Sequence, residues 1–129
     1  MFKAQAAFSG FSVKDLAETQ KFYTEILELK AEDGEMGLKL QLPNGGTLFV
    51  YPKDDHQPAT FTILNFVVDD IDEAVKELKG RGVTFEQYDN MTDEDGIARG
   101  LAANRGPDIA WFKDPAGNII SVLQDSKKD

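Results

Sequence analysis

The sequence predicts an α+β fold made of two similar β-α-β-β-β units. Residues 11–16 read F-S-V-K-D-L, and residues 66–71 read F-V-V-D-D-I at an offset of 55 residues. Residues 43–50 read P-N-G-G-T-L-F-V, and residues 115–122 read P-A-G-N-I-I-S-V at an offset of 72 residues. Internal self-similarity of this kind indicates a repeated structural unit. The larger second offset implies that the second copy carries an insertion.

The length and apolar content suit one domain with its own core. The chain has 129 residues, of which 41% are hydrophobic, and this is ordinary for a globular domain. We expect a single domain over residues 1–129. Its parts are unit one at about 4–52, a linker at 53–59, and unit two at about 60–124 with the insertion at 89–107.

Charge and composition exclude several classes of partner. The net charge is −9 and there are no cysteines, so disulfides and thiolate metal sites are excluded. Nucleic acid is not an expected partner, because phosphates require basic patches. No apolar run approaches the ~18 residues of a membrane span, and no leader is recognisable at the start of the chain. We expect a cytoplasmic protein whose acidity favours cationic ligands or serves solubility alone.

In the first unit, Asp15 precedes an apolar stripe at helical spacing. Glu18 follows three residues later, as in a capping box, so a helix is expected over residues 15–27. The expected strands are residues 4–12, 30–33, 36–42 and 47–51, with a hairpin turn at 43–46.

The second unit repeats this pattern. Asp70 and Glu73 repeat the capping pair, and Gly80 or Gly82 is expected to end the helix. The expected strands are residues 60–68, 83–88, 109–113 and 119–123, with a turn at 114–118. Within the insertion, residues 96–103 are expected to form an additional short strand or turn across the mouth of a cleft.

Two segments carry a family resemblance. Residues 11–29, F-S-V-K-D-L-A-E-T-Q-K-F-Y-T-E-I-L-E-L, resemble the opening of the vicinal oxygen chelate superfamily. Residues 109–124, I-A-W-F-K-D-P-A-G-N-I-I-S-V-L-Q, resemble its closing hairpin. Glyoxalase I, extradiol dioxygenases, and fosfomycin- and bleomycin-resistance proteins share that fold. The resemblance implies that the two units form a curved, cleft-bearing mixed sheet and that the chain is a homodimer.

The resemblance also implies where metal ligands would stand. Metalloenzymes of this family take one ligand from the first and last strand of each unit, usually His or Glu. The matching positions here are Phe8, Phe49, Ile63 and Ser121. Divalent metals need nitrogen and oxygen donors, and the single histidine, His56, lies in the linker. We therefore expect no metal and no cofactor.

Strand alternation extends these positions into a predicted cleft wall that is aromatic and apolar with a few polar groups. The alternative is that the aromatic side chains pack on one another and fill the cleft. Arg99, in the insertion, is expected either to meet an anionic group on a ligand or to pair with Asp93, Glu94 or Asp95. The predicted ligand-binding residues are Phe8, Phe49, Tyr51, Ile63, Asn65, Trp111, Ser121 and Arg99.

Three functions fit these observations. The first is a metal-free protein that sequesters or carries a small molecule. The second is an enzyme of lyase or dioxygenase type, whose active site has been replaced or lies elsewhere. The third is a structural or regulatory dimer with a filled cleft. Because the predicted site holds no obvious base or nucleophile, the first is favoured and enzymatic activity stays open.

Overall fold

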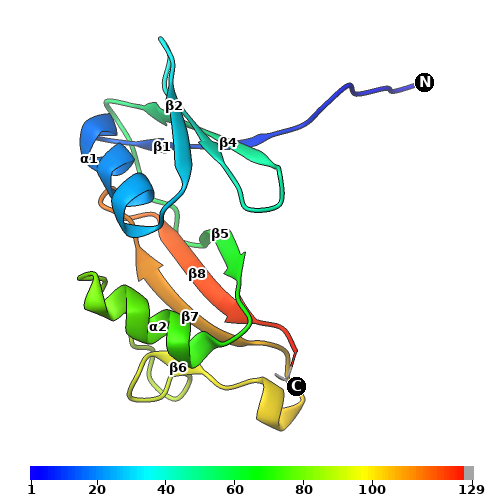
Figure 1. The fold of residues 1–129 in the computed structure, drawn as a ribbon, viewed down its shortest axis with the longest axis vertical. Coiled ribbons are helices and arrows are strands. Elements are labelled where there is room, and N and C mark those ends of the chain that lie inside the picture. Colours follow the sequence, from blue (N-terminus) through cyan, green and yellow to red (C-terminus); the bar gives the residue numbers. More distant parts are fainter. Residues whose placement is uncertain (127–129) are drawn as a thin grey trace. The chain divides into compact units, whose positions relative to one another are not determined.

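The computed structural model describes residues 1–126, which divide into two compact units. The first unit ends at Pro58 and the second begins at Ala59. Each unit contains one four-stranded mixed sheet with a helix against one face (Figure 1). No helix in the described part of the chain is both long enough and apolar enough to cross a membrane.

The first unit has the predicted β-α-β-β-β order. Its sheet has the strand order β1-β4-β3-β2, in which only the β1–β4 pair is parallel. The predicted strand at 4–12 is too long, because β4 begins at Thr47 and leaves residues before Ser9 without a neighbouring strand. The strands are β1 (Ser9–Val13), β2 (Lys30–Asp33), β3 (Leu38–Gln41) and β4 (Thr47–Pro52).

The helix of the first unit begins where the capping pair predicts. The Asp15 carboxylate accepts a hydrogen bond from the Glu18 N–H at 3.0 Å, which satisfies a donor that α1 (Leu16–Lys21) leaves free. The expected α-helix to residue 27 is wrong in its second half, where the chain forms a π-helical turn, Phe22–Ile26. There the Leu27 N–H bonds to the Phe22 carbonyl, five residues back.

The apolar core of this unit lies between the helix and one face of the sheet. Register pairs Leu38 with Val50 and Leu40 with Leu48, and all four side chains are buried. Tyr23 of the helical segment is also fully buried, and its ring centroid lies 6.0 Å from that of Phe11 on β1. The residues between the buried strand residues, such as Lys39, therefore stand on the opposite, open face of the sheet.

The second unit repeats the order and the sheet topology, β5-β8-β7-β6. Its elements are β5 (Thr62–Val67), α2 (Ile71–Gly80), β6 (Ile97–Ala98), a 3-10 turn (Leu101–Ala103), β7 (Asp108–Lys113) and β8 (Ile119–Gln124). The Asp70 cap forms as predicted, accepting from the Glu73 N–H at 3.2 Å. Helix α2 ends at Gly80, and Gly82 follows it with a left-handed backbone.

The strand predicted at 83–88 is wrong. Only an isolated bridge, Phe85 to Phe112, forms there. The chain then turns away from the sheet, because the Met91 and Thr92 N–H groups both bond to the Tyr88 carbonyl. The edge strand is instead β6, which pairs antiparallel with β7. Segment 89–107 thus supplies the fourth strand of the sheet, in place of the strand expected at 83–88, and does not add a fifth strand to it.

The core of the second unit lies under α2. Ile71, Val75 and Leu78 of the helix are buried with Phe112 and Ile120 of the sheet. Phe112 is fully buried, and its ring meets Phe85 at 5.5 Å between centroids. Alternation places Trp111 on the open face.

Candidate functional site

A cavity of about 410 Å³ lies on the open face of the first sheet. The predicted residues Phe8 and Phe49 both line it, although Phe8 immediately precedes β1 and Phe49 lies within β4. A volume of this size suits a small organic molecule. The residues that line the cavity are Phe8, Glu32, Asp33, Gly34, Gly37, Lys39, Thr47, Leu48 and Phe49.

Phe49 stands at the centre of this face. It lies on β4, with Gly10 of β1 on one side and Lys39 of β3 on the other. Its ring stacks on that of Tyr51, with 5.8 Å between centroids and 19° between planes. A Cβ on Gly37 would stand 2.9 Å from the Phe49 Cζ. Because Gly37 has no side chain, the Phe49 ring has room for the position that it occupies.

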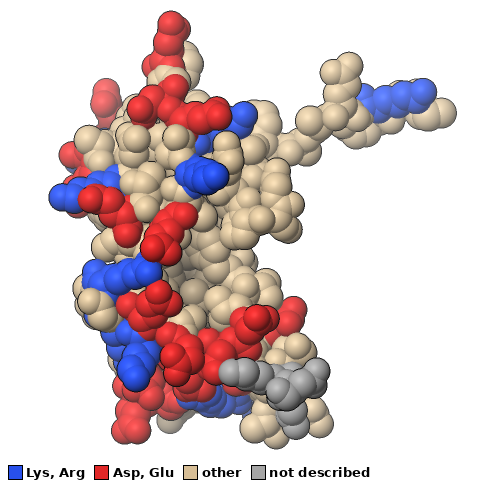
Figure 2. Space-filling model, viewed as in Figure 1, with Lys and Arg blue, Asp and Glu red and all other residues tan. Residues whose placement is uncertain are grey.

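Three charged side chains line the same cavity. Glu32 and Asp33 end strand β2, and Lys39 lies on β3 directly opposite Glu32. The Lys39 ammonium and the Glu32 carboxylate are 3.9 Å apart, and both side chains are more than half exposed. Figure 2 shows acidic side chains gathered over the end of β2. The cavity thus combines aromatic walls with a charged rim that is net negative.

Tyr51 does not line the cavity but continues the same face. It pairs with Ser12 of β1, whose hydroxyl is 2.7 Å from the Nδ1 of His56. His56 therefore lies against the end of the first sheet, and the segment predicted as a linker is attached to unit one. The stacked Phe49 and Tyr51 rings form a continuous aromatic strip along β4.

The open face of the second sheet brings together three other predicted residues. Asn65, Ser121 and Trp111 form one row across β5, β8 and β7. Ser121 is fully buried, and its hydroxyl donates to the Asn65 side-chain oxygen at 2.5 Å. The Trp111 ring meets Tyr88 edge to face at 5.4 Å. Ile63 lies at a bulge between β5 and β8, beside this row.

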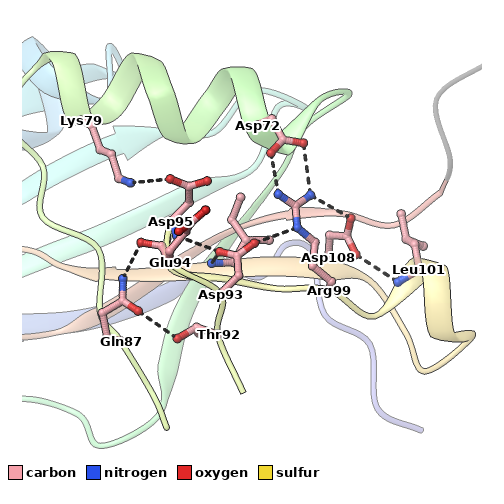
Figure 3. A network of polar contacts seen from close by, with 11 residues as sticks. Asp72, Lys79, Gln87, Thr92, Asp93, Glu94, Asp95, Arg99, Leu101 and Asp108 are labelled. Atoms are coloured by element: carbon pink, nitrogen blue, oxygen red, sulfur yellow. Dashed lines mark hydrogen bonds and ion pairs between the residues drawn. The ribbon is translucent and has the colours of Figure 1, made fainter. Parts of the chain in front are cut away.

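Arg99 belongs to a polar network in the second unit (Figure 3). Its guanidinium donates to Asp72 of α2 at 2.6 and 3.1 Å and to Asp93 at 3.1 Å. Asp108 of β7 lies 3.7 Å away and also accepts from the Leu101 N–H at 3.0 Å. Of the two expectations for Arg99, the structure shows the ion pair with Asp93 and adds Asp72 and Asp108 as partners.

These contacts shift the pKa values of Arg99 and Asp93. The hydrogen bond to Asp72, followed by that to Asp93, raises the pKa of Arg99 above its usual range despite partial burial. For Asp93, burial acts to raise the pKa, but hydrogen bonds from Ile97, Arg99 and Asp95 together outweigh it and lower the pKa. The network ties the loop before β6 to helix α2 and to β7, so it holds the edge strand in place.

The donor set does not fit the metal of the related metalloenzymes. The four corresponding positions hold two phenylalanines, an isoleucine and Ser121, and the Ser121 hydroxyl is bonded to Asn65. Among residues 1–126, no three His, Asp or Glu side chains gather in a way that could hold a metal ion. A divalent cation would find too few nitrogen or oxygen ligands at these positions.

Sequence reasoning missed the charged rim of the first cavity. Glu32, Asp33 and Lys39 were not among the predicted contacts, because strand pairing, not spacing along the chain, brings β2 and β3 beside Phe49. One signal was available: Lys39 lies between Leu38 and Leu40. In a strand that buries both leucines, the lysine must face the other side.

Comparison with known proteins places the chain in a family. The sequence profile described as "Glyoxalase/Bleomycin resistance protein/Dioxygenase superfamily" matches residues 6–122. No curated protein matches the chain.

Solved structures share the fold. The antibiotic-binding protein TnmS3 from Streptomyces sp. CB03234 is 25% identical, with a TM-score of 0.65, covering 97% of this chain and 100% of its own. A superfamily member from Sphaerobacter thermophilus DSM 20745 is 24% identical, with a TM-score of 0.68, covering 95% and 98%. The fosfomycin resistance protein FosX from Listeria monocytogenes is 15% identical, with a TM-score of 0.69, covering 96% and 93%.

Proposed function

The chain belongs to the glyoxalase/bleomycin resistance protein/dioxygenase superfamily, and we propose that within it the chain is a metal-free protein that binds and sequesters or carries a small molecule. The observation that carries this proposal is the cavity on the open face of the first sheet, lined by Phe8 and Phe49. An apolar wall with a few polar groups at its edge is the usual chemistry of a small-molecule site.

The aromatic residues supply the contact area of this proposed site. Phe49 is fixed by its stack on Tyr51 and by its fit against Gly37, so little side-chain freedom is lost when a ligand packs on it. Phe8 is 71% exposed, and a bound molecule would cover it. The likeness to an antibiotic-binding protein over the full length of that protein supports the same reading.

The second sheet offers further proposed contacts. Asn65, Trp111 and Ser121 lie in one row across it, and Ile63 lies at the bulge beside them. Asn65 is exposed, whereas Ser121 is fully buried and contributes by its hydrogen bond to Asn65. We assign Arg99 to the fold of the second unit and not to a ligand, because carboxylates of Asp72, Asp93 and Asp108 surround its guanidinium. Metal-assisted catalysis of the related enzymes is disfavoured by the donor set.

Matched phenylalanine variants test the proposal. A small-molecule screen by thermal shift on the intact chain would identify ligands, since a molecule that binds only the folded state raises its stability. Phe8→Ala should then weaken binding by more than about fivefold, as expected when a contacting aromatic is removed. Phe2→Ala is the control, because Phe2 is 91% exposed and does not line the cavity. Equal affinities for the two variants would contradict the assignment.

We also propose that the chain forms a homodimer. Contiguous exposed apolar patches mark surfaces that associate, and we assign Phe61 and Val67 of the second unit, which are 68% and 64% exposed, to such a surface. Sedimentation velocity at micromolar concentration should give twice the mass of one chain. The Val67→Glu variant should sediment at the mass of a single chain. Sedimentation of the unaltered chain at the monomer mass would contradict this proposal.

A further inference from the structure

We propose that the ligand of the first unit's cavity is a cation: an apolar or aromatic molecule that carries a protonated amine or a quaternary ammonium. This inference rests on the proposed binding function and adds the charge class of the ligand. It is carried by the way in which strands β2, β3 and β4 place carboxylates beside an aromatic ring.

Register fixes that placement. Glu32 pairs with Lys39, and Lys39 pairs with Phe49, so the three side chains form one row across the open face. Directly opposite residues of antiparallel strands have Cβ atoms about 5 Å apart. A molecule lying on the Phe49 ring is therefore within reach of the polar ends of β2 and β3. All three of these residues line the cavity, together with Asp33.

The charges of this rim favour a cation. The Lys39 ammonium lies 3.9 Å from the Glu32 carboxylate. This distance is long for an ion pair, and an ion pair at such an exposed position is weak. Asp33 forms no ion pair with any residue in the described part of the chain, and this exposed residue lines the cavity at the end of β2. An incoming ammonium would add the counter-charge that Lys39 supplies only in part.

The aromatic walls favour the same class. A cation over the face of a phenylalanine ring is attracted by the negative charge density of that face. Phe8 and Phe49 both line the cavity that the carboxylates border. Residues 1–58 also carry more carboxylates than lysines and contain no arginine, so the surrounding field opposes an anionic ligand. Lys39 is the one basic side chain of the described residues that lines the cavity, and we assign it as a selectivity residue.

Three probes of one shape and different charge test the inference. Naphthylmethylamine, naphthylmethanol and naphthoate are titrated separately into the intact chain by calorimetry at low salt. The amine should bind roughly tenfold more tightly than the alcohol, from one cation–π contact and one exposed charge pair. Naphthoate should bind most weakly. The preference of amine over alcohol should shrink as salt is added, because exposed charges are screened.

Charge variants assign the preference to named residues. Asp33→Asn and Glu32→Gln should each weaken amine binding about threefold and leave the alcohol unchanged. Lys39→Gln should strengthen amine binding by a similar factor. Asp54→Asn and Glu25→Gln are matched controls, since both carboxylates are exposed on the same unit and neither lines the cavity. The controls should bind all three probes as the unaltered chain does.

The outcomes separate this inference from the proposed function. If amine and alcohol bind equally, or if the control variants lower amine binding as much as Asp33→Asn does, the cation class is wrong while small-molecule binding stands. If none of the three probes binds, the cavity is not a binding site and the proposed function fails with the inference. Tighter binding of naphthoate than of the amine would reverse the assignment of charge.

Discussion

The ring of Phe49 and the backbone of Gly37 occupy adjoining space so closely that a side chain at Gly37 has no room. A Cβ built there would stand 2.9 Å from the Phe49 Cζ and would overlap the carbonyl oxygen of Val50. The backbone carbonyl cannot move without disturbing β4. Gly37 therefore both permits the β3–β4 pairing and leaves the Phe49 ring in place at the cavity.

Substitution of this glycine should destabilise the protein. We predict that Gly37→Ala lowers the free energy of unfolding by about 1–3 kcal/mol, the usual penalty for overpacking a filled site. Gly46→Ala is the matched control, because its Cβ would meet only Leu42 Cδ1 at an ordinary 3.5 Å. Urea unfolding of both variants measures the difference. If the two unfold at the same urea concentration, the close fit at Gly37 is not significant.

Removal of the Arg99 guanidinium should loosen the edge of the second sheet. We predict that Arg99→Gln lowers the free energy of unfolding by about 1 kcal/mol, a modest value because the side chain is 38% exposed. Amide hydrogen exchange should accelerate most at residues 93–98, which the network holds. Arg105→Gln, at an exposed position of the same loop, should leave exchange unchanged. Uniform acceleration across the unit would contradict a local role.

The same network predicts a pH dependence. The pKa of Asp93 is lowered in the folded chain from an ordinary value of 3.8, so its charge stabilises the folded state above that pH. This contribution is lost as the pH falls through the lower folded pKa. The stability difference between the unaltered chain and Asp93→Asn should therefore be full near neutral pH and shrink below about pH 4. A difference that stays constant between pH 7 and pH 3 would contradict the shift.

Much of the fold could be predicted because local signals repeat. The capping pairs Asp15–Glu18 and Asp70–Glu73 both form as expected, since each depends on residues three apart. The strand predicted at 83–88 was wrong. Its apolar pattern reflects the packing of Phe85 on Phe112, and only an isolated bridge, not a continuous ladder of backbone hydrogen bonds, forms there. The short strand or turn expected at 96–103 is present as the strand Ile97–Ala98 and the 3-10 turn Leu101–Ala103, but two strand residues are too few to show a period, so the role of this strand as the sheet edge was not predicted.

The candidate site was less accessible to sequence reasoning. Phe8 and Phe49 could be located by the resemblance to the family together with the repeat, and both line the cavity. Glu32 and Asp33 could not, because their place at the cavity depends on the register between β2, β3 and β4. The link between Arg99 and Asp72 spans 27 residues and joins a loop to a helix. Short-range patterns do not report such contacts.

Divalent metals should not stabilise the protein. The positions that match the family's metal ligands include Phe8 and Phe49, which have no donor atoms. We predict that added Zn²⁺, Ni²⁺, Mn²⁺ or Fe²⁺ leaves the Tm unchanged, because an ion must bind the folded state preferentially to raise it. Elemental analysis of the purified chain is the companion measurement. A stoichiometric metal with a rise in Tm would show that a donor set exists elsewhere in the chain.

Binding of a small molecule on the open face of the first sheet, at the cavity beside Phe49, can be observed residue by residue. The measurement is two-dimensional amide NMR of the intact chain, titrated with naphthylmethylamine. We predict saturable shifts at residues that line the cavity, such as Gly34, Gly37 and Phe49, with none along the exposed face of α2. Saturable shifts confined to other parts of the chain, or no shifts at all, would contradict it.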